Sequence, residues 1–337
     1  MLLKTLSELN GTSGAEKTIR EYLRQVLEPY ASEMVIDRMG NLIVHKVGRK
    51  PGPLVMVAAH MDEVALMVTE VTAEGFLKFV PVGGVDPRIL PAKVVKVGVE
   101  GIKGVIGIKA FHLTKPVERE KAPEADELCI DVGAKSLEQA AALVQPGDYA
   151  YFDTKFEFLG KEYFKGKALD DRIGCAVLTK ILQRDYDCPL VGVFTVQEEV
   201  GMRGATVAAY RLEPALAIVL EGTVSGDMPD AGERDWVTTP GQGPACSLMD
   251  NATLYPPRLI KKVVEVANSK GIPLQFRRSK NGGNDAGSIH LTKGGVPTIA
   301  ISVPCRYIHS WFSLAAKSDY EATIELVDNL VREIRGA

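Results

Sequence analysis

Apolar residues recur along the chain with two spacings, one typical of helices and one typical of buried strands. Residues 13–16, Ser-Gly-Ala-Glu, match a helix capping box, and apolar residues then follow every three or four positions. This spacing predicts an amphipathic helix that begins at the box. Two short strand-like pieces, 34–36 and 42–45, flank the turn-forming pair Gly40-Asn41 and predict a β-hairpin.

A continuous apolar run, 54–59, ends at His60 and is typical of a strand that is covered on both faces. From Asp170 onward, helical and strand-like patterns alternate. This alternation indicates an α/β fold in which helices cover both faces of a sheet. The strands expected in this part are 190–196, 216–220 and 298–303, and the helices are 173–182, 259–267 and 324–334.

The stretch between these α/β parts has a different pattern. Short β-rich pieces such as 94–99 and 104–108 are separated by Gly and Pro. A small β-barrel inserted into the α/β domain explains this change. We therefore expect the first part of the α/β domain at 1–64, the inserted barrel at 65–161, and the second part of the α/β domain at 162–337.

Composition and charge restrict the classes of partner. The chain has 337 residues, 46% of them hydrophobic, and a formal net charge of -3 at pH 7. It contains no long run of Lys and Arg for nucleic acid or an anionic membrane surface, and no apolar run approaches the ~20 residues of a membrane span. The five cysteines are scattered, as in a reducing compartment. We expect a cytoplasmic protein that binds neither nucleic acid nor membranes.

Candidate catalytic side chains follow the ends of the predicted strands, where open α/β sheets bind ligands. His60 and Asp62 follow the first buried strand, so one ring nitrogen of His60 could bind a metal while the other donates to Asp62. On this tripeptide alone a structural histidine paired with a carboxylate is the favoured interpretation, because His-x-Asp is short and common by chance. Glu198 and Glu199 follow strand 190–196, where adjacent carboxylates need a cation or a proton, although a helix N-terminus also favours acids.

Three more candidates lie at other predicted element ends: Asp170, Glu221 and His309. Individually, Asp170 fits a helix N-cap, and the other two fit ordinary loop residues. Together with His60 and the paired glutamates they provide nitrogen and oxygen donors. Such a donor set suits zinc, cobalt or manganese better than calcium.

Five motifs, in this order, resemble the cocatalytic dinuclear metallo-aminopeptidases. That family includes glutamyl aminopeptidase and the tetrahedral (TET) aminopeptidases, and some of its members carry an endoglucanase label. The resemblance covers essentially the whole chain, with one departure at Trp311, where relatives often have Pro after the His-Ser pair. The motifs are AHMDEV at 59–64, KALDDR at 167–172, QEEVG at 197–201, EGT at 221–223 and RYIHS at 306–310.

The resemblance implies a zinc-exopeptidase-like fold and two divalent metal ions, with zinc or cobalt preferred and manganese an option. Glu198 would be the general base and Asp62 a second catalytic residue, and the Asp170-Asp171 peptide would be cis. Short peptides would be the substrates, and the chain would self-associate through the inserted domain, from dimers up to dodecamers. The implied metal ligands are His60 and Glu221 at one ion, Glu199 and His309 at the other, and Asp170 between them.

Two other functions fit parts of the sequence. An endoglucanase-like glycoside hydrolase would use two carboxyl groups about 5 to 9.5 Å apart, but it would leave His60, Asp62 and His309 without a task. A non-catalytic peptide-binding assembly protein would use the barrel alone, although every base and ligand position is present. The sequence therefore favours an aminopeptidase that removes N-terminal residues from peptides.

Overall fold

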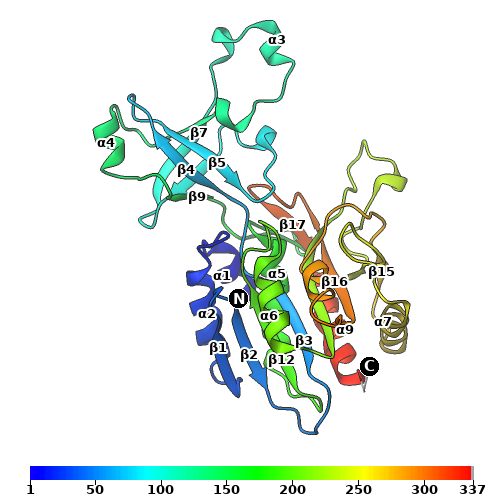
Figure 1. Cartoon of the computed structure of the whole chain (residues 1–337). Coiled ribbons are helices and arrows are strands. Elements are labelled where there is room, and N and C mark those ends of the chain that lie inside the picture. The colour runs from blue at the N-terminus through cyan, green and yellow to red at the C-terminus, as the bar shows by residue number, and fades with distance from the viewer. Residues whose placement is uncertain (335–337) are drawn as a thin grey trace. The chain divides into compact units, whose positions relative to one another are not determined.

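The computed structural model describes residues 1–334, with the side chain of Glu118 excepted, and the chain divides into two compact units (Figure 1). The first unit comprises residues 1–63, 156–308 and those from 312 onward, and the second comprises 64–155 and 309–311. Each unit has a hydrophobic core of its own.

A mixed sheet forms the centre of the first unit. Its strands lie in the order β1–β2–β12–β3–β13–β16–β17–β11–β10, and β12, β3, β13 and β16 are mutually parallel. Two short strands, β14 (Ala245–Cys246) and β15 (Gln275–Phe276), extend from β16. The strands on the main path are β1 (Glu33–Ile36), β2 (Leu42–Lys46), β3 (Val55–His60), β10 (Glu157–Leu159), β11 (Tyr163–Gly166), β12 (Leu190–Thr195), β13 (Leu216–Val224), β16 (Thr298–Arg306) and β17 (Ser313–Ala316).

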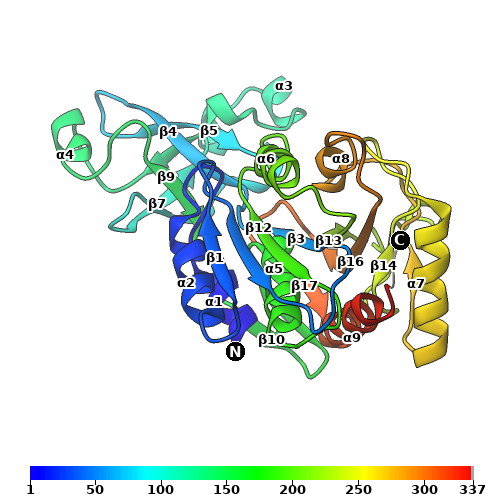
Figure 2. The same ribbon diagram turned by 60° about the horizontal axis from the view of Figure 1, so that its bottom comes forward.

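Helices cover both faces of this sheet, as Figure 2 shows. The helices α1, α2, α5 and α9 lie on one face, α6 and α8 lie on the other, and α7 packs beside α9. Every residue of β3 and β12 is buried, because these strands are covered from both sides. The α/β fold class is therefore confirmed. The helices are α1 (Leu2–Glu8), α2 (Lys17–Leu27), α5 (Leu169–Leu182), α6 (Arg203–Leu212), α7 (Pro257–Lys270), α8 (Ala286–Ile289) and α9 (Lys317–Glu333).

The N-terminal region differs from its prediction in one respect. A helix, α1, precedes the expected one, and α2 begins only at Lys17, without a side-chain cap. The capping box predicted at Ser13 to Glu16 is therefore wrong. Ser13 Oγ donates instead to Asp62 Oδ2 at 2.6 Å, and Glu16 Oε1 accepts from the Gln197 backbone N–H at 3.1 Å. Both side chains therefore form hydrogen bonds with residues distant in sequence and do not cap the helix.

The second unit is a closed β-barrel with strand order β4–β5–β8–β7–β6–β9, which confirms the inserted barrel. Along β6, Val95 and Val97 are buried in the barrel core, whereas Val94 is exposed, as the alternation of side chains in a barrel requires. Two short helices, α3 (Pro116–Arg119) and α4 (Leu137–Ala141), lie in its connections. The strands are β4 (Ala65–Val71), β5 (Leu77–Val82), β6 (Val94–Val97), β7 (Ile102–Gly107), β8 (Cys129–Asp131) and β9 (Tyr149–Phe152).

Candidate metal centre

Neighbouring parallel strands of the first unit bring several predicted site residues to one edge of the sheet. His60 is the last residue of β3 and lies opposite Thr195, the last residue of β12. Glu221 lies in β13 two residues beyond the Val219–Ala58 pair, which places it level with His60. The carboxyl ends of parallel strands are the usual ligand-binding edge of such a sheet.

The His60 imidazole is almost fully buried and faces three carboxylates. Its Nε2 lies 3.3 Å from Asp170 Oδ1, 3.6 Å from Glu221 Oε2 and 3.9 Å from Glu198 Oε2. Its Nδ1 lies 3.1 Å from the Asp62 carbonyl oxygen and 3.4 Å from Asp62 Oδ1, so the shorter contact is to the backbone and not to the expected carboxylate. A proton on Nδ1 serves both acceptors and leaves the Nε2 electron pair directed at the carboxylates.

The Asp170-Asp171 peptide bond is cis, and both residues have non-helical backbone angles within the first turn of α5. Asp170 faces His60, whereas Asp171 is fully buried behind it. Asp171 Oδ2 accepts from the His60 backbone N–H at 3.2 Å, and Oδ1 accepts from the Gly174 N–H at 3.0 Å. Asp171 thus joins the end of β3 to the start of α5, a role that its motif position did not indicate.

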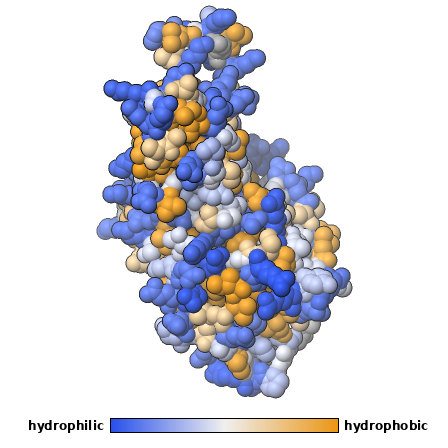
Figure 3. All heavy atoms as spheres, turned by 60° about the vertical axis from the view of Figure 1, so that its left-hand side comes forward, coloured by the Kyte–Doolittle hydropathy of each residue, from blue (hydrophilic) through white to orange (hydrophobic). Residues whose placement is uncertain are grey.

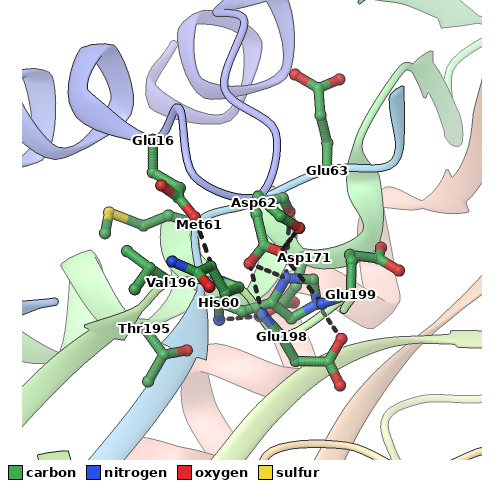
Figure 4. A network of polar contacts seen from close by, with 12 residues as sticks. Glu16, His60, Met61, Asp62, Glu63, Asp171, Thr195, Val196, Glu198 and Glu199 are labelled. Carbon is green, nitrogen blue, oxygen red and sulfur yellow. Dashed lines mark hydrogen bonds and ion pairs between the residues drawn. The ribbon is translucent and has the colours of Figure 1, made fainter. Parts of the chain in front are cut away.

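We call His60 and the six carboxylate residues around it the acidic cluster. Burial raises the pKa of Glu221 to about 8 and raises the pKa of Glu198 well above its usual value. Burial by itself lowers the pKa of His60, but hydrogen bonds to three of the carboxylates raise it well above the usual range. The cluster therefore favours added positive charge. Its members are His60, Asp62, Asp170, Asp171, Glu198, Glu199 and Glu221, and Figure 4 labels all of them except Asp170 and Glu221.

The donor chemistry of the acidic cluster fits a divalent cation. Ligand atoms of His60, Asp171 and Glu221 lie within 4.8 Å of one another, and so do those of His60, Glu198 and Glu199. Glu221 Oε1 is buried and has no hydrogen-bond partner among the described residues. One imidazole nitrogen with several carboxylate oxygens is a zinc-like, cobalt-like or manganese-like donor set.

His309, the remaining predicted ligand, belongs to the second unit. Its Nδ1 lies 2.8 Å from the Gly84 carbonyl oxygen of the same unit. A proton on Nδ1 would donate to that carbonyl, and this is the tautomer in which Nε2 can bind a metal. The neighbouring Trp311, also in this unit, has the Lys93 Nζ 4.4 Å from its ring centroid.

Three residues that the sequence analysis did not single out lie close to the acidic cluster. The Thr195 hydroxyl donates to Asp285 Oδ2 at 2.5 Å, and burial raises the pKa of Asp285 to about 6. The Cys175 thiol donates to the His60 carbonyl oxygen at 3.1 Å. Asp285 lies in a polar stretch without a strand end or metal-ligand spacing, so no sequence signal marks it.

A second buried charged group lies beside the acidic cluster, and we call it the Glu63 cluster. Lys167 Nζ is 2.6 Å from each carboxylate oxygen of Glu63, and Arg172 Nη2 is 3.3 Å from Oε1. All three side chains are buried. The remaining guanidinium N–H groups of Arg172 donate to backbone carbonyls, those of Leu6, Leu9, Gly11 and Met61.

The chain is similar to known proteins over nearly its whole length. The family model of the M42 glutamyl aminopeptidases matches residues 40–326. The lysyl aminopeptidase of Pyrococcus furiosus is 34% identical over 99% of this chain and 97% of its own length.

Solved structures give the same result. A TET aminopeptidase from a marine sediment Thaumarchaeota archaeon is 35% identical, with a TM-score of 0.96 over 99% of this chain and 96% of that chain. The TET1 peptidase of Pyrococcus horikoshii, which can assemble into a tetrahedron or a large octahedral shell, is 33% identical, with a TM-score of 0.88 over 98% of each chain. The chain therefore belongs to the M42 glutamyl aminopeptidase family.

Proposed function

We propose that this protein is a metal-dependent aminopeptidase that removes N-terminal residues from short peptides with the help of two divalent ions. The observation that carries the proposal is the acidic cluster, in which His60 Nε2 faces the carboxylates of Asp170, Glu198 and Glu221 in a buried setting. Membership of the M42 family supports the same reaction class.

Within this proposal, His60 and Glu221 would hold one ion, Glu199 and His309 would hold the other, and Asp170 would contribute to both. The assignment of His60 and Asp170 as ligands of the same ion is supported by the 3.3 Å distance between His60 Nε2 and Asp170 Oδ1. At this distance both atoms could bind one cation placed between them. The assignment of Glu199 and His309 follows from the family resemblance. Zinc or cobalt is the preferred metal, and manganese accepts the same donors.

In the proposed reaction, water attacks the first peptide carbonyl carbon, and the bond to the leaving nitrogen breaks. Bound divalent ions lower the pKa of water, polarise the carbonyl and anchor a free amino group. Glu198 accepts the proton of the attacking water and returns it to the leaving amine. Asp62 holds the His60 ring in place, since its carbonyl oxygen and carboxylate both lie within 3.4 Å of Nδ1.

The glycoside hydrolase alternative is not favoured. Its two carboxyl groups act on either side of a sugar bond and need no buried imidazole between them. In this chain the carboxylates of Asp170, Glu198 and Glu221 converge on one nitrogen of His60, Nε2, instead. A peptide-binding protein without catalysis would not require a buried concentration of negative charge that favours a cation.

We also propose that the chain self-associates through its inserted domain. The barrel unit exposes hydrophobic side chains, and orange patches are visible over it in the upper part of Figure 3. Patches of this kind commonly mark protein interfaces. The exposed hydrophobic residues of the barrel unit include Phe76, Val80, Val94, Val99, Val105, Ile108, Phe111 and Leu113. Sedimentation of the purified chain would measure the assembly, and a strictly monomeric protein would contradict it.

The test of the proposed activity is hydrolysis of matched peptides with free and N-acetylated termini, with and without chelator. We expect cleavage of the free-terminus peptides only, loss of cleavage with chelator, and recovery when zinc or cobalt is added back. Cleavage of acetylated peptides, or full activity of the chelated protein, would contradict the proposal. Cleavage of a soluble cellulose derivative but of no peptide would favour the glycoside hydrolase.

A further inference from the structure

The loop that follows β12 and carries Glu198 and Glu199 is held by side chains from the first 62 residues of the chain. Four successive backbone N–H groups of this loop each donate to a side-chain oxygen, as part of the network in Figure 4. The acceptors are Asn41 Oδ1 for Val196 at 3.0 Å, Glu16 Oε1 for Gln197 at 3.1 Å, Asp62 Oδ1 for Glu198 at 3.1 Å and Asp62 Oδ2 for Glu199 at 3.1 Å.

The backbone of this loop needs such support. Gln197 has a φ of 57°, in the left-handed region that residues with a side chain rarely adopt. The loop closes on itself through hydrogen bonds from Gly201 and Met202 to the Glu198 carbonyl, both at 2.9 Å. A backbone of this kind persists where surrounding contacts over-determine it, and its exact path decides where the Glu198 and Glu199 carboxylates point.

Two residues of the N-terminal segment complete this support. Ser13 is buried, and its Oγ donates to Asp62 Oδ2 at 2.6 Å, so it orients the carboxylate that holds the Glu198 and Glu199 N–H groups. Glu16 Oε1 accepts from Gln197 and also from the Gly14 N–H at 2.9 Å. Ser13 and Glu16 are the two polar ends of the motif that matches a capping box but does not cap α2.

These two contacts are not what docks the N-terminal segment. The segment has separate anchors, because the Ser7 hydroxyl donates to the Lys167 carbonyl at 2.7 Å and the Thr12 hydroxyl donates to the Glu63 carbonyl at 2.6 Å. Arg172 adds hydrogen bonds to three carbonyls between Leu6 and Gly11. Ser13 and Glu16 therefore support the loop after β12, whereas the hydrogen bonds of Ser7 and Thr12 hold only the N-terminal segment.

We propose that Ser13 and Glu16 are positioning residues for the peptidase reaction. From the N-terminal segment they fix the Gln197–Glu199 backbone, Ser13 through Asp62 and Glu16 directly, and thereby the carboxylates of the general base and of its neighbour. They act through these groups and do not contact the substrate. The kinetic part of this inference rests on the proposed function, whereas its effect on the loop does not.

The direct test is amide hydrogen exchange of the loop, followed by mass spectrometry in the metal-free and zinc-loaded protein. We expect Ser13→Ala and Glu16→Ala to increase exchange within 197–199 by about tenfold, because a lost hydrogen bond is worth about 1 to 1.5 kcal/mol. Ser7→Ala is the matched control, since it also removes a buried serine hydroxyl that donates a hydrogen bond, here to the Lys167 carbonyl oxygen. Equal exchange in Ser13→Ala and the parent, or an equal rise in Ser7→Ala, would overturn the inference.

The second test measures kcat and KM of the same variants. We expect Ser13→Ala and Glu16→Ala to lower kcat about tenfold at nearly unchanged KM, with an unfolding midpoint lowered no further than in Ser7→Ala, whose kcat should stay close to that of the parent. Glu16→Gln keeps a side-chain oxygen acceptor and Ser13→Thr keeps the hydroxyl, so both should restore most of the loss. If Glu16→Gln and Ser13→Thr keep the parent's hydrogen exchange in the loop but do not restore kcat, the inference is overturned. A parent protein that cleaves no peptide would refute the proposed function alone, because the exchange experiment still decides whether the loop is positioned.

Discussion

The acidic cluster and the Glu63 cluster contain two adjacent residues of the chain, Asp62 and Glu63, but their charges are arranged in opposite ways. In the Glu63 cluster, one carboxylate lies against Lys167 and Arg172, and Arg172 also satisfies several carbonyl groups. In the acidic cluster, several carboxylates surround the single imidazole of His60. Figure 4 shows Glu63 directed away from His60, whereas Asp62 lies beside it.

This difference separates a structural group from one that needs a ligand. A buried ion pair is tolerated when each charge has partners, and removing one partner is then strongly unfavourable. A buried surplus of carboxylates is unfavourable as it stands, and a bound cation or bound protons relieve it. Burial alone therefore does not identify the site, because both clusters are buried. The balance of charge within each cluster does.

The largest effect is expected from the proposed base. Glu198→Gln should lower kcat by about 100-fold to 10,000-fold, because general acid–base catalysis contributes this much. The bound metal, measured by elemental analysis, should stay close to the parent level. Glu138→Gln, on the exposed surface of the barrel unit, is the control and should match the parent. An active, metal-loaded Glu198→Gln protein would refute the assignment of the base.

The next largest effect is a loss of stability when the Glu63 cluster is disrupted. Arg172→Met should lower the free energy of unfolding by about 3 to 5 kcal/mol, because it leaves Glu63 and four backbone carbonyls with fewer partners. Chemical denaturation would measure the loss. Arg24→Met removes an exposed arginine that pairs with the exposed Glu21 and should cost at most about 1 kcal/mol. Similar losses of unfolding free energy in the two variants would contradict a structural role of the Glu63 cluster.

Removing a charge from the acidic cluster should have the opposite effect and raise the free energy of unfolding of the metal-free protein. Glu221→Gln removes one of the crowded carboxylates, so at pH 8 the metal-free variant should be more stable than the metal-free parent, by on the order of 1 to 3 kcal/mol. The same variant should bind zinc or cobalt more weakly, which competition with a coloured chelator would measure. A metal-free Glu221→Gln protein that is less stable than the parent would show that the carboxylates are already balanced.

The last prediction is a pH trend of the metal-free protein. Glu221 has a pKa raised from 4.5 to about 8, so between these values the folded state binds more protons than the unfolded state. Stability should therefore fall as the pH rises from about 5 to 8, and the raised pKa of His60 acts in the same direction above pH 6.5. Saturating zinc should weaken or reverse the trend. Thermal unfolding at several pH values would test it, and a metal-free stability that increases with pH would contradict it.

Much of the fold could be predicted because local patterns report burial. The apolar runs 54–59 and 190–196 correspond to β3 and β12, whose residues are all buried, and the interrupted β-rich stretch corresponds to a closed barrel. Helix α1 was missed because its seven residues are too short to show a helical period. The candidate ligands could be proposed because strand ends and ordered motifs indicate where chemistry is placed in an α/β sheet.

Sequence by itself determined the α/β class, the inserted barrel and the types of side chain available for metal binding, because periodicity and motif order are local properties. Only the tertiary structure decided which polar groups pair. Ser13 meets Asp62 across 49 residues, and Glu16 meets Gln197 across 181 residues, and so neither serves the helix that their motif predicts. The same holds for Asp62 and Glu63, adjacent in the chain, which enter clusters of opposite charge balance. Long-range hydrogen bonds and buried charges depend on the packed strands, and no local pattern encodes them.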